Sequence, residues 1–527
     1  MLFNSYVFIF LFMPLVLGGY VLLARRFSRQ LTIHWLVVAS LFYYGWWSWK
    51  FLALLVVLML VNAAFGQLLL SGSGSTKLRR GLLMAGIIFN LTALCYYKYA
   101  GFLAANLNVL LQTDIDVGNI VLPLGISFFT FQKIAFLVDA YRRDVQDFNL
   151  PGYFLFVSFF PQLIAGPIVH HKEMMPQFAR LTSKHLNLSN FAVGFSIFAL
   201  GLFKKVWIAD TCAIFADKAF SAVMQGAVLT TGGAWRGASA YAFQIYFDFS
   251  AYSEMAIGLA RMVGIVLPLN FDSPYKASNI IEFWRRWHIT LMRFLRDYLY
   301  FPLGGNRRGT LRRYVNLMSV MLLGGLWHGA AWTFVVWGGI HGVLLTINHA
   351  WHSFRRRIGF ELGRGGVLGR HAAVVATFLI VTATWVPFRA ANTEVAFSMW
   401  RSMLDPGRST LLSGSMPSPP TLTAPTTIRL GGIIADEVDL LRHAIESIPH
   451  SESVWLIAML AIVLFAPSVV DIFEPHNFAM REKVKPAMLP RWYHWQPNAT
   501  WAIFVAVAFS MSILHLTTVS PFLYFQF

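Results

Sequence analysis

Long apolar segments recur along almost the whole chain and are separated by short polar loops. The first runs from residue 4 to residue 24, and others lie near residues 33–49, 51–70, 82–99, 119–138, 190–208, 238–262, 314–332, 334–351, 372–389, 453–471 and 499–516. A helix needs roughly 20 mainly apolar residues to cross a bilayer. The pattern therefore predicts an all-α polytopic membrane protein, a single integral-membrane domain over residues 1–527 with about 11–13 membrane helices, re-entrant elements included.

The composition agrees with a membrane protein. Of the 527 residues, 57% are hydrophobic and 13% are charged, whereas soluble domains carry roughly 25% charged residues. The segment 4–24 has no basic region before it and no A-x-A cleavage site after it, so we expect a retained first helix and not a signal peptide. Cys95 and Cys212 lie in separate apolar surroundings, which gives no basis for a disulfide framework or a thiolate metal site.

The positive charge of the chain lies in its loops. The net charge is +18, from 42 Lys and Arg against 24 Asp and Glu. Topology and contact with membrane phospholipid explain this charge, so no nucleic-acid partner is expected. The loop at residues 401–451 is predicted on the outer side, mobile at its Pro/Ser/Thr-rich centre and with a short surface helix at 440–448. The basic clusters predicted to be cytoplasmic are 25–29, 77–80, 142–143, 355–370 and 481–491.

The apolar segment 151–169 departs from this alternation. Basic residues flank it on both sides, so both of its ends are predicted to face the cytoplasm. Pro161, Gly166 and Pro167 interrupt helical hydrogen bonding within it. We interpret it as a re-entrant or interfacial element sheltered by protein, with an ordinary kinked span as the alternative.

A dense cationic region, FWRRWHITLMRFLRDYLYFPLGGNRRGTLRR, occupies residues 283–313. At the inner membrane surface such a segment is suited to binding a phosphorylated cofactor through bidentate arginine contacts. The alternative is a polybasic interfacial helix on anionic lipid, which charge alone favours. The candidate phosphate ligands are Arg285, Arg286, Arg293 and Arg296.

Helical spacing makes two further predictions for this region. If its first part is one helix, Trp284, His288 and Arg296 lie on one face, together with Met292. Arg293 and Asp297 are also four residues apart and are then spaced to form an ion pair.

His328 lies in the apolar run LLGGLWHGAAWTFVVWGGIHG. An ionisable side chain at membrane depth is costly and usually faces a partner, a cavity or a reaction, and histidine exchanges a proton near neutral pH. It follows Arg313 by fifteen residues, about 22 Å in a helix, although Gly324 and Gly325 are able to break that helix. His328 is a candidate catalytic residue, with a hydrogen-bonded structural histidine as the alternative. His341 is either its structural partner or another buried polar residue.

Two carboxylates stand in the apolar segment YAFQIYFDFSAYSEMAIGLARM, residues 241–262. Asp248 and Glu254 require partners if buried, and we expect arginines or histidines to supply them in an architectural polar network. The chain has no G-x-S-x-G elbow, Walker loop, H-E-x-x-H helix or cysteine-rich metal motif. Serine-hydrolase, ATPase and zinc-protease activities therefore lack support.

Several of these segments together closely resemble the membrane-bound O-acyltransferase family, particularly its bacterial alginate O-acetylase branch. The similarity extends from the opening MLFNSYVFIFLFMPL to the terminal SPFLYFQF, whereas the loop 401–451 carries no family signature. The resemblance implies a many-helix fold around a central, membrane-spanning reaction chamber. The motifs that carry it are LPLGISFFTFQKIAFLVDAYR, FFPQLIAGPIV, YFDFSAYSEMAIGLARM, FWRRWHITLMRFLRDYLYFPLGGNRRG and LLGGLWHGAAWTF.

The resemblance also implies roles for two histidines. The invariant histidine of the family corresponds to His328, which would act as the general base toward the attacking hydroxyl. The second characteristic histidine corresponds to His288, which would line the cytoplasmic entry and orient a thioester donor. Acetyl-CoA is implied as the acyl-donor substrate, with the four candidate arginines at its phosphates, and neither a permanently bound cofactor nor a metal is expected.

The branch implies an O-acetyltransferase of the bacterial inner membrane. Acetyl would pass from cytoplasmic acetyl-CoA to separate periplasmic O-acetyltransferase proteins, which modify an exopolysaccharide, and the loop 401–451 would be periplasmic. The segment from TLMRF onward departs slightly from the usual sequence of this branch. Alginate is the expected acceptor. The alternatives are cellulose, peptidoglycan, teichoic acid or another envelope polymer, a non-catalytic acetyl-donor transporter, and a scaffold for the periplasmic enzymes.

Overall fold

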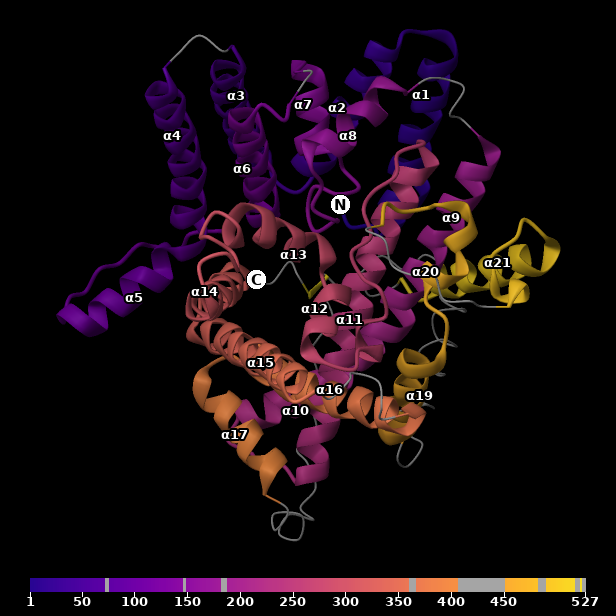
Figure 1. Ribbon diagram of the computed structural model, residues 1–527. Helices are drawn as coiled ribbons and strands as arrows, with labels where there is room; N and C mark the ends of the chain where they lie inside the picture. Colours follow the sequence, from indigo (N-terminus) through magenta and orange to yellow (C-terminus); the bar gives the residue numbers. More distant parts are fainter. Residues whose placement is uncertain are drawn as a thin grey trace.

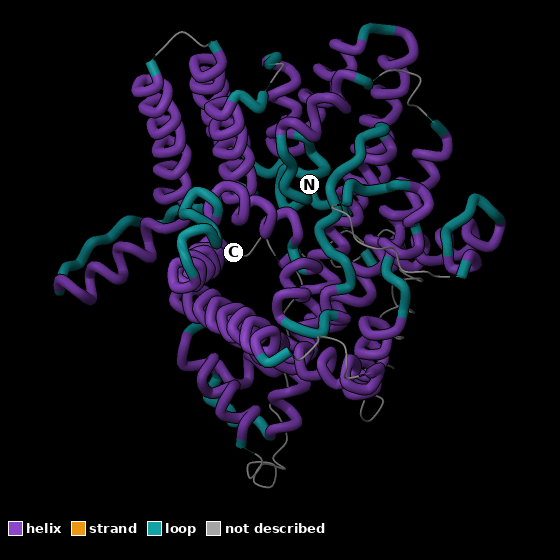
Figure 2. Tube along the Cα trace, viewed as in Figure 1, coloured by secondary structure: helices purple, strands orange, loops and turns teal. Residues whose placement is uncertain are grey.

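The computed structural model describes the chain as an assembly of helices. Within the described residues the regular elements are helices (Figure 2). The β-type backbone pairing among these residues is an isolated bridge between Pro268 and Met480. The prediction of an all-α protein is therefore confirmed for this part of the chain. The described residues are 1–71, 75–145, 148–181, 187–359, 366–405, 451–481, 490–516 and 522–523.

The first eight α-helices form one side of the molecule (Figure 1). α3 and α4 pack against α6, α2 packs against α7, and α7 contacts α8. α5 projects away from this group (Figure 1). The bounds are α1 Met13–Arg26, α2 Arg29–Gly45, α3 Trp49–Leu70, α4 Thr76–Leu94, α5 Ala100–Leu111, α6 Ile126–Arg142, α7 Leu150–Ser158 and α8 His171–Ala179.

Serine residues set the beginnings of α2, α3 and α4. The hydroxyls of Ser28, Ser48 and Ser75 each accept a hydrogen bond from the backbone N–H three residues later. These caps satisfy N–H groups that have no partner inside the helix. Each apolar run therefore becomes helical directly after its serine.

A central group of helices is built around α11, most of whose residues are buried. α9, α10, α16 and α17 pack against it. A Cβ atom on Gly194 of α9 would lie 2.6 Å from the carbonyl oxygen of Gly258 on α11, so glycine at this crossing lets the two backbones touch. The bounds are α9 Leu188–Phe203, α10 Asp210–Met224, α11 Thr231–Met262, α16 Gly366–Arg389 and α17 Thr393–Leu404.

The remaining α-helices are α12 to α15 and α19 to α21. α14 and α15 form a closely packed pair, α15 also contacts α16, and α21 packs against α9. The bounds are α12 Ile280–Arg286, α13 Ile289–Leu295, α14 Thr310–His328, α15 Trp332–Arg357, α19 Ser451–Phe465, α20 Val469–Ile472 and α21 Ala499–Leu514.

Five helical stretches among the described residues are long and apolar enough to cross a membrane by length and composition. α3 also exposes large apolar side chains such as Val57 and Leu60, which is the surface that lipid requires. α11 is covered by neighbouring helices and needs no such surface. The five stretches are Val7–Arg26, Trp49–Leu70, Thr76–Leu111, Leu188–Met224 and Gly366–Arg389.

The structure describes one of the two predicted irregular segments, 151–169, and the beginning of the other, 401–451. α7 has 9 residues, and residues 159–169 after it are buried and outside any α-helix. The segment 151–169 is therefore not the kinked span that was the alternative. α17 continues to Leu404, so the first residues of the expected outer loop 401–451 are helical, and its placement on the outer side stays a prediction. Residues 406–450, including the expected helix at 440–448, lie outside the described residues.

Candidate functional site

His328 is the last residue of α14, and its side chain is only 4% exposed. α14 is continuous through Gly324 and Gly325, so the glycine pair does not break the helix. A Cβ atom on Gly325 would overlap the carbonyl oxygen of Phe334 in α15. Gly325 therefore serves the close packing of α14 on α15, whereas a Cβ atom on Gly324 would meet only the Leu295 side chain at 3.5 Å.

Aromatic rings surround the His328 imidazole. The ring centroids of Trp327, Trp337 and Phe388 lie 4.9, 5.2 and 5.2 Å from its own. The ring of His288 lies 6.3 Å away. The structure thus brings together the two histidines proposed from sequence, although 40 residues separate them in the chain.

Lys98 fixes the backbone at the end of α14. Its Nζ donates hydrogen bonds to the carbonyl oxygens of Trp327 and His328, the latter at 3.1 Å, and to Ser127 Oγ at 3.3 Å. The Tyr99 hydroxyl donates to the Leu326 carbonyl oxygen at 2.9 Å. The last carbonyls of a helix have no partner within it, and a cation there is favourable. Lys98 and Tyr99 belong to the π-helical turn Cys95–Tyr99, a distortion often found at functional sites.

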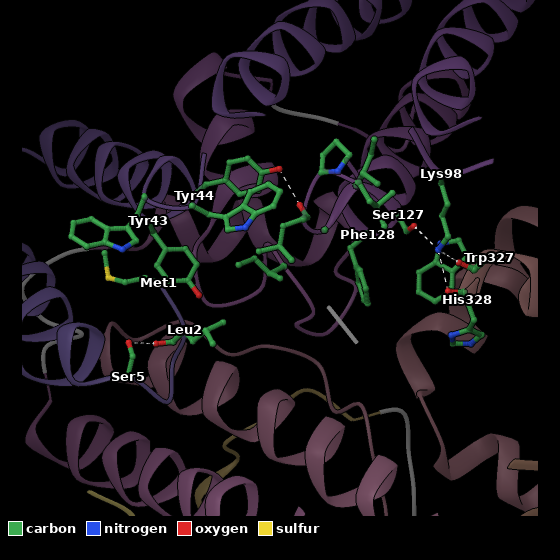
Figure 3. Close-up of a pocket in the computed structure, with 18 of the residues that line it drawn as sticks. Met1, Leu2, Ser5, Tyr43, Tyr44, Lys98, Ser127, Phe128, Trp327 and His328 are labelled. Carbon is green, nitrogen blue, oxygen red and sulfur yellow. Dashed lines mark hydrogen bonds between the residues drawn. The ribbon is translucent and has the colours of Figure 1, made fainter. Parts of the chain in front are cut away.

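His328 forms part of the wall of a cavity of about 500 Å³. The N-terminal residues, the end of α2, the segment 122–128 and the end of α14 enclose it. Its polar groups near His328 are those of Lys98 and Ser127 (Figure 3). In Figure 3, Lys98, Ser127, Phe128, Trp327 and His328 lie on one side of the cavity and Met1, Leu2, Ser5, Tyr43 and Tyr44 on the other.

His288 lies at a break between two helices. α12 ends at Arg286, and His288 has φ 44° and ψ 51° as the residue that precedes α13. The prediction that one helix places Trp284, His288 and Arg296 on a common face was therefore wrong. A left-handed backbone is unfavourable for histidine and persists only where the surroundings hold it.

Asn270 holds the side chain of His288. Asn270 Oδ1 lies 3.0 Å from His288 Nδ1 and accepts a hydrogen bond from Thr290 Oγ1 at 2.9 Å, while its Nδ2 donates to Ser253 Oγ at 3.1 Å. An amide oxygen is only an acceptor, so Nδ1 carries the proton and Nε2 is the basic nitrogen of the neutral ring. Sequence reasoning missed both Lys98 and Asn270, because neither belongs to a motif of spaced chemical groups.

The segment after α7 is bound to the region that contains His288. The Ile168 N–H donates to Thr290 Oγ1 at 3.0 Å. Arg293 donates to both carboxylate oxygens of Glu173 in α8, at 2.6 and 2.9 Å. The irregular backbone of residues 159–169 is thus held by specific contacts from α13.

His170, directly before α8, also connects this segment to the residues that follow α13. His170 Nδ1 lies 2.9 Å from the Tyr298 hydroxyl. Burial lowers the pKa of His170 to about 4, and the nearby Arg293 guanidinium acts in the same direction. His170 is therefore neutral at physiological pH, when it contacts Tyr298.

Three of the four candidate arginines pair with carboxylates. Arg286 contacts Glu282 at 2.9 Å, and Arg293 contacts Glu173. Arg296 contacts Asp297 at 2.8 Å, so the expected Arg293–Asp297 ion pair was wrong. None of the four arginines is among the described residues that line the cavity at His328.

Arg285 differs from the other three arginines. No carboxylate among the described residues pairs with it, and it lines a separate open cavity of about 510 Å³ with His349, His352, Arg356 and Glu282, whose carboxylate pairs with Arg286. Its guanidinium is therefore available for an anionic ligand without the loss of an ion pair.

Lysines neutralise the buried carboxylates of α11. Lys205 Nζ lies 2.7 Å from Asp248 and 2.8 Å from Asp210, and Lys204 Nζ lies 2.6 Å from Glu254. The expectation that arginines or histidines would be the partners was wrong. The network has a structural role, because it joins α11 to the π-helical turn Lys204–Ala209 between α9 and α10.

His341 lies within the aromatic packing and is fully buried. Trp284 Nε1 donates to its Nδ1 at 3.3 Å, and the Trp337 ring lies between His341 and His328, 4.9 and 5.2 Å from their centroids. His341 is thus a buried polar residue in contact with the tryptophans, and it supports the wall that His328 contacts.

Comparison with known proteins assigns the family. Residues 41–380 match the model of the MBOAT, membrane-bound O-acyltransferase, family. The chain belongs to this family. It is a membrane-bound, multi-pass O-acyltransferase.

Several relatives carry names from envelope chemistry. The chain is 44% identical over 430 residues to a peptidoglycan O-acetyltransferase of Helicobacter pylori, which covers 77% of this chain and 80% of that protein. It is 37% identical over 549 residues to the probable alginate O-acetylase AlgI of Pseudomonas aeruginosa, with 100% of both chains covered. A teichoic acid D-alanyltransferase of Streptococcus thermophilus is 27% identical over 256 residues, 46% of this chain and 61% of that protein. The likeness to membrane acyltransferases of envelope polymers thus extends over the whole chain.

Proposed function

We propose that this acyltransferase carries acetyl from cytoplasmic acetyl-CoA across the bacterial inner membrane to periplasmic partner proteins that O-acetylate an exopolysaccharide. The observation that carries the proposal is the position of His328. Its imidazole is almost completely buried, yet it forms part of the wall of a cavity large enough for a reacting group. A buried proton acceptor beside a cavity is the arrangement that general-base catalysis requires.

In the proposed step, His328 accepts the proton of the acceptor hydroxyl as its oxygen attacks the acetyl carbonyl carbon. The new C–O bond forms and the C–S bond of the thioester breaks. The imidazolium then returns the proton to the departing thiolate, so the coenzyme leaves as a thiol. The Lys98 hydrogen bonds keep the His328 backbone in place during this step, which preserves the alignment on which the rate depends.

His288 is proposed to orient the donor. Its Nδ1 is held by Asn270, and its ring centroid lies 6.3 Å from that of His328, directly behind the described residues that line the cavity. The four arginines remain proposed contacts to the donor phosphates. Arg285 is the strongest candidate among them, because Arg286, Arg293 and Arg296 would have to exchange a carboxylate for the phosphate.

The acceptor polymer is proposed to be alginate. The relatives that align with 100% of this chain include the probable alginate O-acetylases AlgI of Pseudomonas aeruginosa and Pseudomonas syringae. Peptidoglycan is the second candidate, because the Helicobacter pylori relative named for it is 44% identical. Acetyl content of each secreted and wall polymer, measured with and without this protein, separates the two.

The test of the proposed chemistry is the His328→Ala variant, with His371→Ala as the matched control at an exposed position outside the described cavities. Polymer acetylation should be lost in the first and kept in the second, with both proteins inserted and monodisperse. Near-normal acetylation in His328→Ala would refute the general-base role. Purified protein supplied with labelled acetyl-CoA should label an acceptor or partner, whereas a scaffold or a transporter would leave the thioester intact.

A further inference from the structure

A second, larger cavity lies away from His328. It measures about 840 Å³ and is bounded by the beginning of α2, the end of α6, the beginning of α7 and one face of α8. Figure 1 shows α2, α7 and α8 close together, in agreement with their packing. None of the described residues that line it also lines the cavity at His328. The two cavities are therefore separate.

The lining of this cavity is strongly basic. Arg29, Arg143 and Lys172 contribute cationic groups, and Asp144 is the single carboxylate among the described lining residues. No carboxylate of the described chain forms an ion pair with Arg143 or Lys172. Arg29 donates to the Ala179 carbonyl oxygen at 2.7 Å, which joins α2 to the end of α8. Cationic side chains outnumber carboxylates among the described lining residues, so the cavity favours an anion.

Helix ends of both kinds meet at the cavity. α2, α7 and α8 begin there, where Arg29, Pro151 and His171 lie in their first turns, and α6 and α8 also end there, at Arg143 and Ala179. The partial charges of helix N-termini and C-termini have opposite signs. The three cationic side chains therefore provide the charge and the hydrogen-bond donors that phosphate oxygens prefer.

Arg143 is held toward this region by an unusual backbone. Its φ is 65° at the end of α6, a left-handed conformation that costs free energy for a residue with a side chain. Its N–H bonds back to the Ala140 and Asp139 carbonyl oxygens. Part of the cavity wall is apolar, with Ile33, Met175 and Phe178. A ligand with a phosphate and an apolar portion would match both parts.

We propose that this cavity binds a phosphate-bearing ligand at the face of the protein where the basic loops predict the cytoplasm. Two sources share that chemistry: the headgroup of an anionic phospholipid and a soluble phosphate compound such as coenzyme A. For the phospholipid the proposal goes beyond acyl transfer. For coenzyme A it rests on the proposed function and places the donor phosphates here instead of at Arg285.

The test uses the purified full chain and two probes. Retention of phosphatidylglycerol against phosphatidylcholine is measured by native mass spectrometry, and binding of unacylated coenzyme A by calorimetry. The variant is Arg143→Gln with Lys172→Gln. The matched control is Arg80→Gln with Arg180→Gln, which removes the same charge at exposed positions outside the cavity.

Binding of at least one probe should weaken about tenfold in the cavity variant, as expected for the loss of charge-assisted hydrogen bonds, and change less than about twofold in the control. Loss of phosphatidylglycerol retention identifies the lipid source, and loss of coenzyme A binding the soluble one. If neither probe binds, or if both variants bind equally well, the proposal is wrong. His328→Ala should bind like the parent protein, so a failure of the proposed catalysis is distinguishable.

Discussion

The Lys98 ammonium donates a hydrogen bond to the backbone carbonyl oxygen of His328, across 230 positions of sequence and a distance of 3.1 Å. Lys98 therefore acts as a positioning residue for His328, since it contacts the backbone and not the imidazole. The bond attaches the π-helical turn Cys95–Tyr99 to the end of α14, and with it the wall of the cavity.

Replacement of Lys98 by Met should remove this attachment while the length of the side chain is kept. We expect kcat for acyl transfer to fall roughly 10- to 100-fold, because small displacements of a reacting group are costly, with KM for the donor little changed. Lys50→Met, at an exposed position, is the control. A rise in KM with unchanged kcat would contradict the positioning role.

Gly325→Ala should disturb the same site from the other side. The new Cβ would overlap the Phe334 carbonyl oxygen, so α14 and α15 must separate, at a cost of about 1–3 kcal/mol. Both thermal stability and acyl-transfer rate should fall.

Gly339→Ala is the matched control, because its Cβ would meet only the Leu322 side chain at an ordinary 3.6 Å. Equal effects of the two substitutions would show that the close approach of the helices is unimportant.

The buried ion pair of Lys205 and Asp248 allows a double-mutant cycle. Lys205→Met alone leaves the buried Asp248 carboxylate uncompensated, also removes the contact of Lys205 with the partly exposed Asp210, and should destabilise the protein by about 3–5 kcal/mol. Adding Asp248→Asn should restore much of that loss, because the uncompensated charge is removed. Denaturation of the purified protein in detergent measures both, and additive losses would exclude coupling between the two residues.

The pH dependence of stability should follow the buried histidines before and within α8. Burial lowers the pKa of His171 from 6.5 to about 4. Between these values the unfolded chain binds a proton that the folded protein does not, so stability falls as the pH decreases from 6.5 towards 4. At pH 5 the loss is about 2 kcal/mol for one such group.

His171→Phe keeps the aromatic packing against Phe136 and Phe156 and should reduce the slope of unfolding temperature against pH. His170 remains, so part of the slope persists. His371→Phe, at an exposed position, is the control. An unchanged slope in His171→Phe would contradict the assignment.

Sequence reasoning predicted the helical fold well, because it depends on local information, and the catalytic roles of the two histidines stay predictions. The apolar runs predicted α3, α9 and α21 without tertiary contacts, since length and hydropathy determine which segments can cross a bilayer. His328 and His288 were found because polar groups in apolar runs and family motifs are visible in one dimension.

The incorrect predictions of side-chain partners and of one helix through His288 have a different cause. The break at His288 depends on Asn270, the carboxylates of α11 depend on lysines more than 40 positions away, and Arg293 pairs with Glu173 instead of Asp297. Helical spacing proposes partners within one helix, whereas the folded chain offers nearer ones from other helices. The spacing of residues within one helix carries no information about contacts with other helices.

The sequence by itself thus determined that this protein is a helical membrane protein, which family it resembles and which two histidines to examine. Hydropathy and motifs suffice for these, because each is a property of a short stretch of chain. Only the tertiary structure decided that His328 forms the wall of a cavity, that Lys98 holds its backbone and that a separate basic cavity lies beside α8. Those features arise where helices distant in sequence pack together, and the free energy of that packing depends on all of them at once.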